Sequence, residues 1–285
     1  MKYPVFITFF SIMLFAACSS DYGISEASSE LVVEGWIEDG GFPVVILTKT
    51  LPVSDRYQNV EEAEDFLVRW AKVSVSDGQD TVVLTGMVDQ SYYPPYIYTT
   101  SKMRGVAGRR YHLLVEYDDV RASASTTVPA PVAVDSFRVE KVNGSDTLYQ
   151  LKACFTDPVD QKNYYQFFTR VGTKSLQFVA SYLGSIDDAV LNGPTEVPVY
   201  RGHQLIGPDY TPYFSVNDSV AVKFAQVDET AFHFWDDYTK SQSLSGNMFL
   251  SSSTPIRTNV KGGIGCWYGC GSTTSYLIIR DYVRK

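Results

Sequence analysis

The chain has 285 residues, of which 45% are hydrophobic and 14% aromatic, and its formal net charge at pH 7 is -8. This length and apolar content can bury a sizeable core, which excludes a disordered chain. The acidic balance argues against nucleic acid as a partner, because nucleic-acid-binding proteins present a basic face to the phosphates.

The N-terminus has the pattern of a bacterial lipoprotein leader. Lys2 precedes the apolar run VFITFFSIMLFAA, which is too short to cross a bilayer as a helix, since that needs about 20 apolar residues. The run ends in two alanines directly before Cys18, although Phe15 stands where leucine is usual. We therefore predict a signal peptide over residues 1–17 and a lipid on Cys18. The alternative is an ordinary secretory signal followed by an incidental cysteine.

Residues 18–28 are small, polar and acidic, as is typical of a tether between a lipid and a folded body. No run of 18 apolar residues follows, so we predict no transmembrane helix and a membrane attachment that rests on the lipid alone.

The segment 29–128 alternates short β-rich runs with turns rich in Gly and Asp, which predicts an immunoglobulin-like β-sandwich of about seven strands. Three hairpins are expected, namely 31–37 with 43–48, 72–76 with 81–85, and 110–117 with 120–128.

A tyrosine-rich segment, SYYPPYIY, lies near the middle of this first half. Its prolines favour an extended backbone, and tyrosine rings stack on sugars or pack against partner proteins. The segment is therefore a candidate binding surface formed by Tyr92, Tyr93, Tyr96 and Tyr98. We favour the alternative, in which these rings only cover the edge of the first sandwich.

Two prolines mark residues 129–136 as a linker between domains. The segment 137–285 then resumes with strand-like runs and is predicted to form a second β-rich domain. It also contains one aromatic helix near 228–244, which Asp228 would cap. Its aromatic residues recur at helical spacing, which is more typical of a core-facing helix than of a partner-binding one.

Cys266 and Cys270 lie in the glycine-rich stretch GGIGCWYGCG. We interpret the glycines as a tight reversal that could bring the two sulfurs within disulfide distance. A zinc site would need two more ligands, and none of the three histidines lies at a zinc-like spacing. We therefore predict no metal and no cofactor, and we expect Cys154, the remaining cysteine, to be a small core residue.

No catalytic motif is present in the sequence. The serine-hydrolase pentapeptide Gly-x-Ser-x-Gly, the zinc-protease motif His-Glu-x-x-His and the phosphate-loop pattern are all missing. Adjacent aspartates occur at 118–119, 187–188 and 236–237, where we interpret them as turn or surface residues rather than catalytic pairs. We therefore expect a protein that is not an enzyme.

Several segments together resemble one family. In order they are LVVEGWIEDGG, VILTKT, VSVSDGQDTVVL, SYYPPYIY, TTVPAPVAVDSF and NVKGGIG. Their order and spacing are similar to those of the Bacteroidota outer-membrane lipoproteins known as domain of unknown function 4249. The stretch Cys-Trp-Tyr-Gly-Cys after Gly265 departs from the pattern. The resemblance implies a place in the cell envelope and an association with TonB-dependent transporters, but no reaction.

The sequence thus predicts a mainly β protein of two β-sandwich-like domains, held to the outer membrane by lipid, with the face of that membrane left open. We expect a non-catalytic binding or accessory component of a TonB-dependent nutrient transporter whose ligand is unknown. A structural or adhesive surface protein is the first alternative, and a hydrolase of envelope or polysaccharide substrates is the second.

Overall fold

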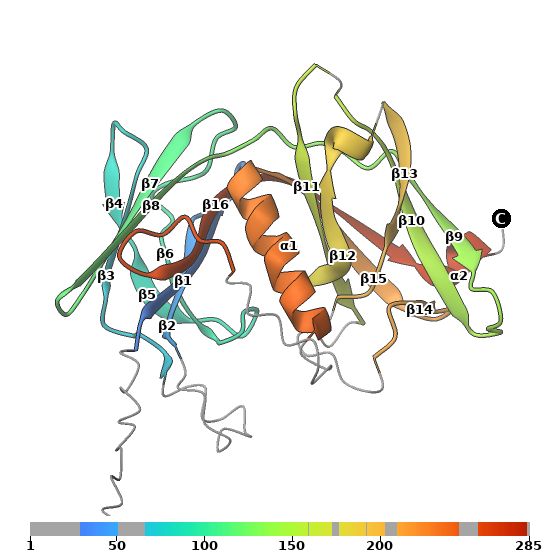
Figure 1. Ribbon diagram of the computed structural model, residues 1–285, viewed down its shortest axis with the longest axis horizontal. Coiled ribbons are helices and arrows are strands. Elements are labelled where there is room, and N and C mark those ends of the chain that lie inside the picture. The colour runs from blue at the N-terminus through green and yellow to red at the C-terminus, as the bar shows by residue number, and fades with distance from the viewer. Residues whose placement is uncertain are drawn as a thin grey trace, which may run out of the picture.

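The computed structural model describes residues 29–50, 66–158, 160–172, 177–191, 193–202, 210–244 and 256–283. The protein is mainly β, and its strands form sandwich-like layers with one long helix in front (Figure 1). The strands of the first half are β1 (Leu31–Glu38), β2 (Val44–Lys49), β3 (Lys72–Ser76), β4 (Thr81–Val83), β5 (Thr85–Val88), β6 (Tyr96–Thr99), β7 (Arg110–Tyr117) and β8 (Val120–Thr127).

Among the described residues, the second half contributes the remaining strands and three helices. Its strands are β9 (Ser136–Lys141), β10 (Leu148–Thr156), β11 (Tyr164–Val171), β12 (Val179–Asp187), β13 (Pro194–Val199), β14 (Phe214–Ser215), β15 (Ser219–Val227) and β16 (Ile264–Ile278). Its helices are the 3₁₀ helix η2 (Asp188–Val190) and the α-helices α1 (Glu229–Leu244) and α2 (Ile279–Val283).

The three predicted hairpins are confirmed. β1 pairs antiparallel with β2, β3 with β4, and β7 with β8. In the last hairpin Tyr117 faces Val120 across a two-residue loop, and Asp118 adopts a positive φ of 48° there. Aspartate tolerates this left-handed conformation better than most residues, so two adjacent aspartates suit the loop.

An eight-stranded sheet runs through both halves of the molecule, in the order β12-β11-β15-β16-β1-β2-β6-β5. Its central strand, β16, pairs in parallel with β1 through residues 264–270 and antiparallel with β15 through residues 270–278. One 15-residue strand therefore belongs to both halves, and Figure 1 shows it crossing from one to the other.

Two smaller sheets pack on one face of the shared sheet. The sheet β4-β3-β7-β8 encloses the first core, and the sheet of β13, β10, β14 and β9 encloses the second. Trp267 of β16 lies in the first core and Leu277 in the second, ten residues further along the same strand. Because side chains alternate along a strand, both odd-numbered residues point to the same face.

The predicted domain division needs one correction. The segment 137–285 was assigned to a second domain, but Val260 and Trp267 are buried in the core of the first half. The linker 129–136 also packs, since Val132 and Val134 lie against the second core. A sequence pattern cannot reveal this arrangement, because period-two alternation reports the buried face of a strand and not which neighbour buries it.

The other face of the shared sheet is covered by α1. As predicted, Asp228 caps this helix, and its Oδ1 accepts a hydrogen bond of 2.8 Å from the amide of Ala231. Trp235 is 8% exposed and packs with Tyr268 of β16, which confirms that the aromatic helix faces the core.

Within the residues that the structure describes, no helix has the length and apolar character needed to cross a membrane.

Candidate functional site

Cys266 and Cys270 do not form the disulfide that the sequence left possible. Both are free thiols, and both lie inside β16, which is extended where a tight reversal was expected. Two residues four positions apart on a strand are separated by about 13 Å, whereas a disulfide needs Cα atoms about 4.4–6.8 Å apart. Burial raises the pKa of both thiols, so they are held in the neutral form and behave as small apolar side chains.

The glycines around these cysteines allow another segment of the backbone to cross β16 closely. A Cβ on Gly269 would lie 2.8 Å from the carbonyl oxygen of Thr127, and one on Gly271 would lie 2.4 Å from the nitrogen of Pro131. The chain that leaves β8 thus passes directly over β16, between the two smaller sheets. Only residues without a side chain permit so close an approach of two backbones.

The four tyrosines of the predicted binding surface do not share one surface. Tyr98 is 2% exposed in the first core, and its hydroxyl donates to the carbonyl of Val68 at 2.7 Å. The ring of Tyr96 lies at the edge of the sandwich, where its hydroxyl donates to the carbonyl of Arg69. Tyr92 packs against Trp36, and Tyr93 alone is exposed. The favoured alternative, rings that cover the edge of the sandwich, describes this segment better.

Cys18 lies outside the described residues, so its predicted lipid stays a prediction. Cys154, expected in the core, is only partly buried and lies beside Glu196 on the surface of the second half. It alternates along β10 with Ala153 and Phe155, whose side chains point inward and occupy the core.

The structure brings together a group of polar residues, of which the sequence analysis singled out only Asp188, as part of an aspartate pair. A shallow, open pocket of about 460 Å³ lies where the β10–β11 connection meets the turn between β12 and β13. We call it the polar cavity, and its lining residues are Asp157, Asp160, Gln161, Lys162, Asp188, Ala189 and Leu191.

A buried hydrogen-bond network forms the base of the polar cavity. Asp157 is 4% exposed, and its Oδ1 accepts from the hydroxyl of Tyr165 at 2.6 Å and from the side-chain Nδ2 of Asn163 at 3.4 Å. The Oδ1 of Asn163 in turn accepts from Nε2 of Gln226 at 2.6 Å. Burial, followed by the hydrogen bond to Asp157, raises the pKa of Tyr165, which keeps this phenol protonated as a donor. The network therefore fixes the Asp157 carboxylate before any ligand arrives.

The two connections that form the polar cavity are bonded to each other. The amide of Asn163 donates to Oδ2 of Asp188, and the amide of Asp188 donates back to the carbonyl of Asn163 at 3.2 Å. Asp187 caps η2 through the amide of Ala189. The aspartate pair 187–188 is thus structural, as interpreted from the sequence, but Asp188 also lines the cavity.

The chemistry of the polar cavity is that of hydrogen bonding. Three carboxylates supply acceptors, while Lys162 supplies an ammonium whose pKa is raised by its hydrogen bond to the Tyr164 hydroxyl. Asp157 already accepts from Tyr165, and Asp188 from Asn163, so both carboxylates are oriented by the protein. Across the described residues, no three His, Cys, Asp or Glu side chains converge as metal ligands would. The arrangement suits a polar ligand that both donates and accepts hydrogen bonds.

The sequence contained a signal for this site, namely five polar residues within the stretch DPVDQKN that joins β10 to β11. Such a stretch reads as an exposed loop. It differs from an ordinary loop because the turn at 187–191 lies against it, and this proximity depends on the register of β11 with β12.

A second charged cluster lies at the junction of the two halves. Lys223 of β15 forms an ion pair with Glu38 of β1, and the other oxygen of Glu38 accepts from Ser272 of β16 at 2.8 Å. Burial by itself would lower the pKa of Lys223, but the attraction of the Glu38 carboxylate exceeds this effect, so the pKa of Lys223 is raised. This cluster joins three strands and serves the packing of the shared sheet.

Comparison with known proteins identifies the family of the chain. No curated protein matches the chain. A family model described as "Domain of unknown function (DUF4249)" matches residues 20–275, which is most of the chain and includes the polar cavity and most of the shared strand β16. The chain therefore belongs to the DUF4249 family, as the order of its motifs predicted.

Proposed function

We propose that this protein is a lipoprotein of the Bacteroidota outer membrane that acts by binding, as an accessory component of a TonB-dependent nutrient transporter. The leader and Cys18 support lipid anchoring, and the family resemblance supports the envelope and the transporter. The polar cavity is the structural observation that carries a binding role. Its carboxylates are oriented by buried hydrogen bonds, as expected of a site that is formed in advance of its ligand.

The position of the polar cavity fits an anchored binding protein. Across the shared sheet, Tyr164, beside the cavity, pairs with Val227, Val227 pairs with Cys270, and Cys270 pairs with Glu38. The cavity therefore lies level with the end of β1. The tether would join the body at the start of β1, which is about 23 Å from the end of this eight-residue strand. In Figure 1, η2 lies at the top and the start of β1 at the bottom. The cavity would thus open away from the bilayer.

The ligand class follows from the lining residues. Carboxylate oxygens accept from hydroxyl or amine groups, and the Lys162 ammonium donates to oxygen. A hydroxyl-rich nutrient such as a sugar satisfies both kinds of group without the cost of burying a charged ligand.

A crosslinked pull-down of the protein from its native membrane tests the accessory role. Mass spectrometry would identify both its partners and the form of the N-terminal peptide. We expect acylated Cys18 together with a TonB-dependent transporter. Acylated Cys18 without a membrane-protein partner would reject the accessory role and favour a structural or adhesive surface protein.

The binding role has its own test. Thermal unfolding of the protein would be followed with a panel of mono- and oligosaccharides, since a ligand that binds the folded state raises its stability. The variant Asp157→Asn should lose the shift caused by a bound sugar. Asp146→Asn, at a surface carboxylate whose side chain is 97% exposed, is the matched control and should keep it. Equal shifts in both variants would remove the polar cavity as the site.

A further inference from the structure

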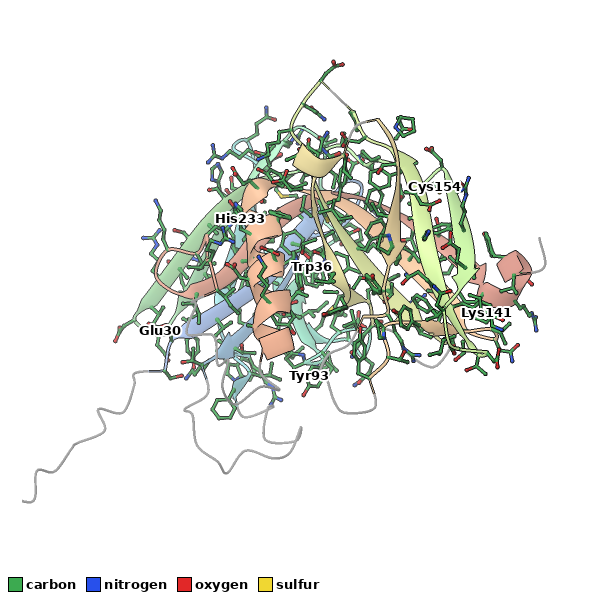
Figure 2. The ribbon with its side chains drawn as sticks, turned by 45° about the vertical axis from the view of Figure 1, so that its right-hand side comes forward. Glu30, Trp36, Tyr93, Lys141, Cys154 and His233 are labelled. Carbon is green, nitrogen blue, oxygen red and sulfur yellow. The ribbon has the colours of Figure 1, made fainter. Side chains whose placement is uncertain are left out.

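The end of the molecule that faces the tether is defined by the strands of the first half. The amide of Glu30 donates to Oγ1 of Thr50 at 2.9 Å, so the start of β1 and the end of β2 lie side by side. β6 runs antiparallel to β2, with Val45 facing Tyr98, so the turn that precedes β6 lies at this same end. Figure 2 shows Glu30 and Tyr93 on the same lower side of the molecule. We call this region the tether end.

Trp70 is 90% exposed and lies beside the start of β6, near the tether end, because the hydroxyl of Tyr96 donates to the carbonyl of the preceding residue, Arg69. Two residues before Trp70, Val68 is 1% exposed in the first core, and its amide donates to the carbonyl of Leu47 on β2 at 3.0 Å. One residue after Trp70, the amide of Ala71 donates to the hydroxyl of Tyr98 at 3.1 Å. The backbone on both sides of Trp70 is therefore anchored to buried groups, and the fold itself directs this ring into solvent.

Two further apolar side chains are exposed nearby. Val88 at the end of β5 is 64% exposed and Tyr93 in the β5–β6 turn is 43% exposed. Val88 pairs with Tyr96, whose hydroxyl is bonded to the carbonyl of Arg69, next to Trp70. An exposed tryptophan with apolar neighbours on a soluble protein marks an interaction surface.

The length of chain before the tether end limits what this surface can meet. Ten residues lie between Cys18 and Ser29, and the fully extended chain from one to the other spans at most about 40 Å. A body anchored through Cys18 thus stays close to the bilayer, with the tether end on the side where the chain leaves for the lipid. Tryptophan and tyrosine prefer the interfacial layer of a membrane, where the ring lies among the headgroups and the polar atom stays hydrated.

We infer that the tether end, with Trp70 as its main contact, rests in the interfacial layer of the bilayer that carries the lipid. The contact orients the body on the membrane and directs the polar cavity away from it. This inference rests on the anchoring part of the proposed function, and it does not depend on a transporter or on a sugar.

Quenching of tryptophan fluorescence by lipid tests the contact. The chain from Cys18 onward contains every residue that the structure describes, and in a Cys154→Ser background its Cys18 can be coupled to a maleimide lipid in phosphatidylcholine vesicles. Brominated acyl chains then quench only rings within reach of the bilayer. Trp235 and Trp267 are buried and Trp36 packs under Tyr92, which leaves Trp70 as the ring in reach.

We expect brominated lipid to quench the tethered protein, and Trp70→Phe to abolish most of that quenching. Tyr276→Phe is the matched control, because Tyr276 is an aromatic residue 73% exposed on the second half, and it should leave the quenching unchanged. Quenching that is absent, or equal with and without Trp70, would overturn the inference.

Chemical coupling keeps this result separate from the proposed function. Whether cells acylate Cys18 is answered by the mass of the N-terminal peptide, whereas the vesicle experiment supplies the lipid artificially. If Trp70 were instead shielded from an aqueous quencher only when a transporter is added, the tether end would be a protein interface and the membrane contact would be rejected.

Discussion

Glu34 provides a direct test of how the shared sheet is packed. It lies on β1, where it faces Ile46 of β2 on one side and Cys266 of β16 on the other. Burial raises the pKa of Glu34 from 4.5 to about 7. A carboxyl in this position costs stability once it ionises, because the unfolded chain gives up its proton more readily than the folded one.

The size of the effect follows from the two pKa values. Below pH 4.5 both states hold the proton and the cost is absent. It grows as the pH rises from 4.5 and levels off above 7. At 1.36 kcal/mol per pKa unit the full cost is about 3 kcal/mol, of which less than half is present at pH 5.5 and nearly all at pH 8.5. The variant Glu34→Gln cannot ionise, so it should gain about 2 kcal/mol more over the parent protein at pH 8.5 than at pH 5.5.

Urea denaturation at the two pH values measures this difference through the midpoint and slope of each transition. Glu30→Gln, at an exposed position beside the start of β1, controls for the general effect of removing a carboxylate. A gain from Glu34→Gln that is the same at pH 5.5 and pH 8.5 would refute the reasoning. The side chain would then be solvated in the folded protein.

Three further predictions concern the junction of the two halves. Lys223→Met should lower the free energy of unfolding by about 1–3 kcal/mol, because Glu38 then lies partly buried without its cation; adding Glu38→Gln should restore much of the loss in urea denaturation, and additive losses would contradict the coupling. Gly271→Val should destabilise by several kcal/mol or prevent folding, seen in circular dichroism, since its Cβ would meet the backbone of Pro131; an unchanged midpoint would place the linker elsewhere. Cys266 and Cys270 should resist alkylation in the native protein and react as two thiols after unfolding without reductant, whereas a mass two units lower would indicate a disulfide.

Local patterns were sufficient where neighbours in sequence determine the structure. The hairpins of the first half follow from the alternation of apolar and polar residues and from the turn residues, because a strand that buries one face carries apolar side chains at every second position. The aromatic helix follows from its spacing and its Asp228 cap. Motif order was likewise enough to place the chain in its family.

The tertiary structure decided which distant segments come into contact, and these contacts determine the domain arrangement and the candidate sites. The glycines near Cys266 look the same in sequence whether they form a reversal or admit a crossing backbone, and only the path of residues 127–131 distinguishes the two. Likewise, the predicted division into two domains did not anticipate that β16 contributes to both cores, because the residues of a strand do not indicate which strands pair with it. The polar cavity brings Asp157 close to Asp188, and near the tether end the hydroxyl of Tyr96 bonds to the carbonyl of Arg69, the residue before Trp70. Each site depends on strand register between distant segments, so the sequence supplies the residues and the fold supplies their proximity.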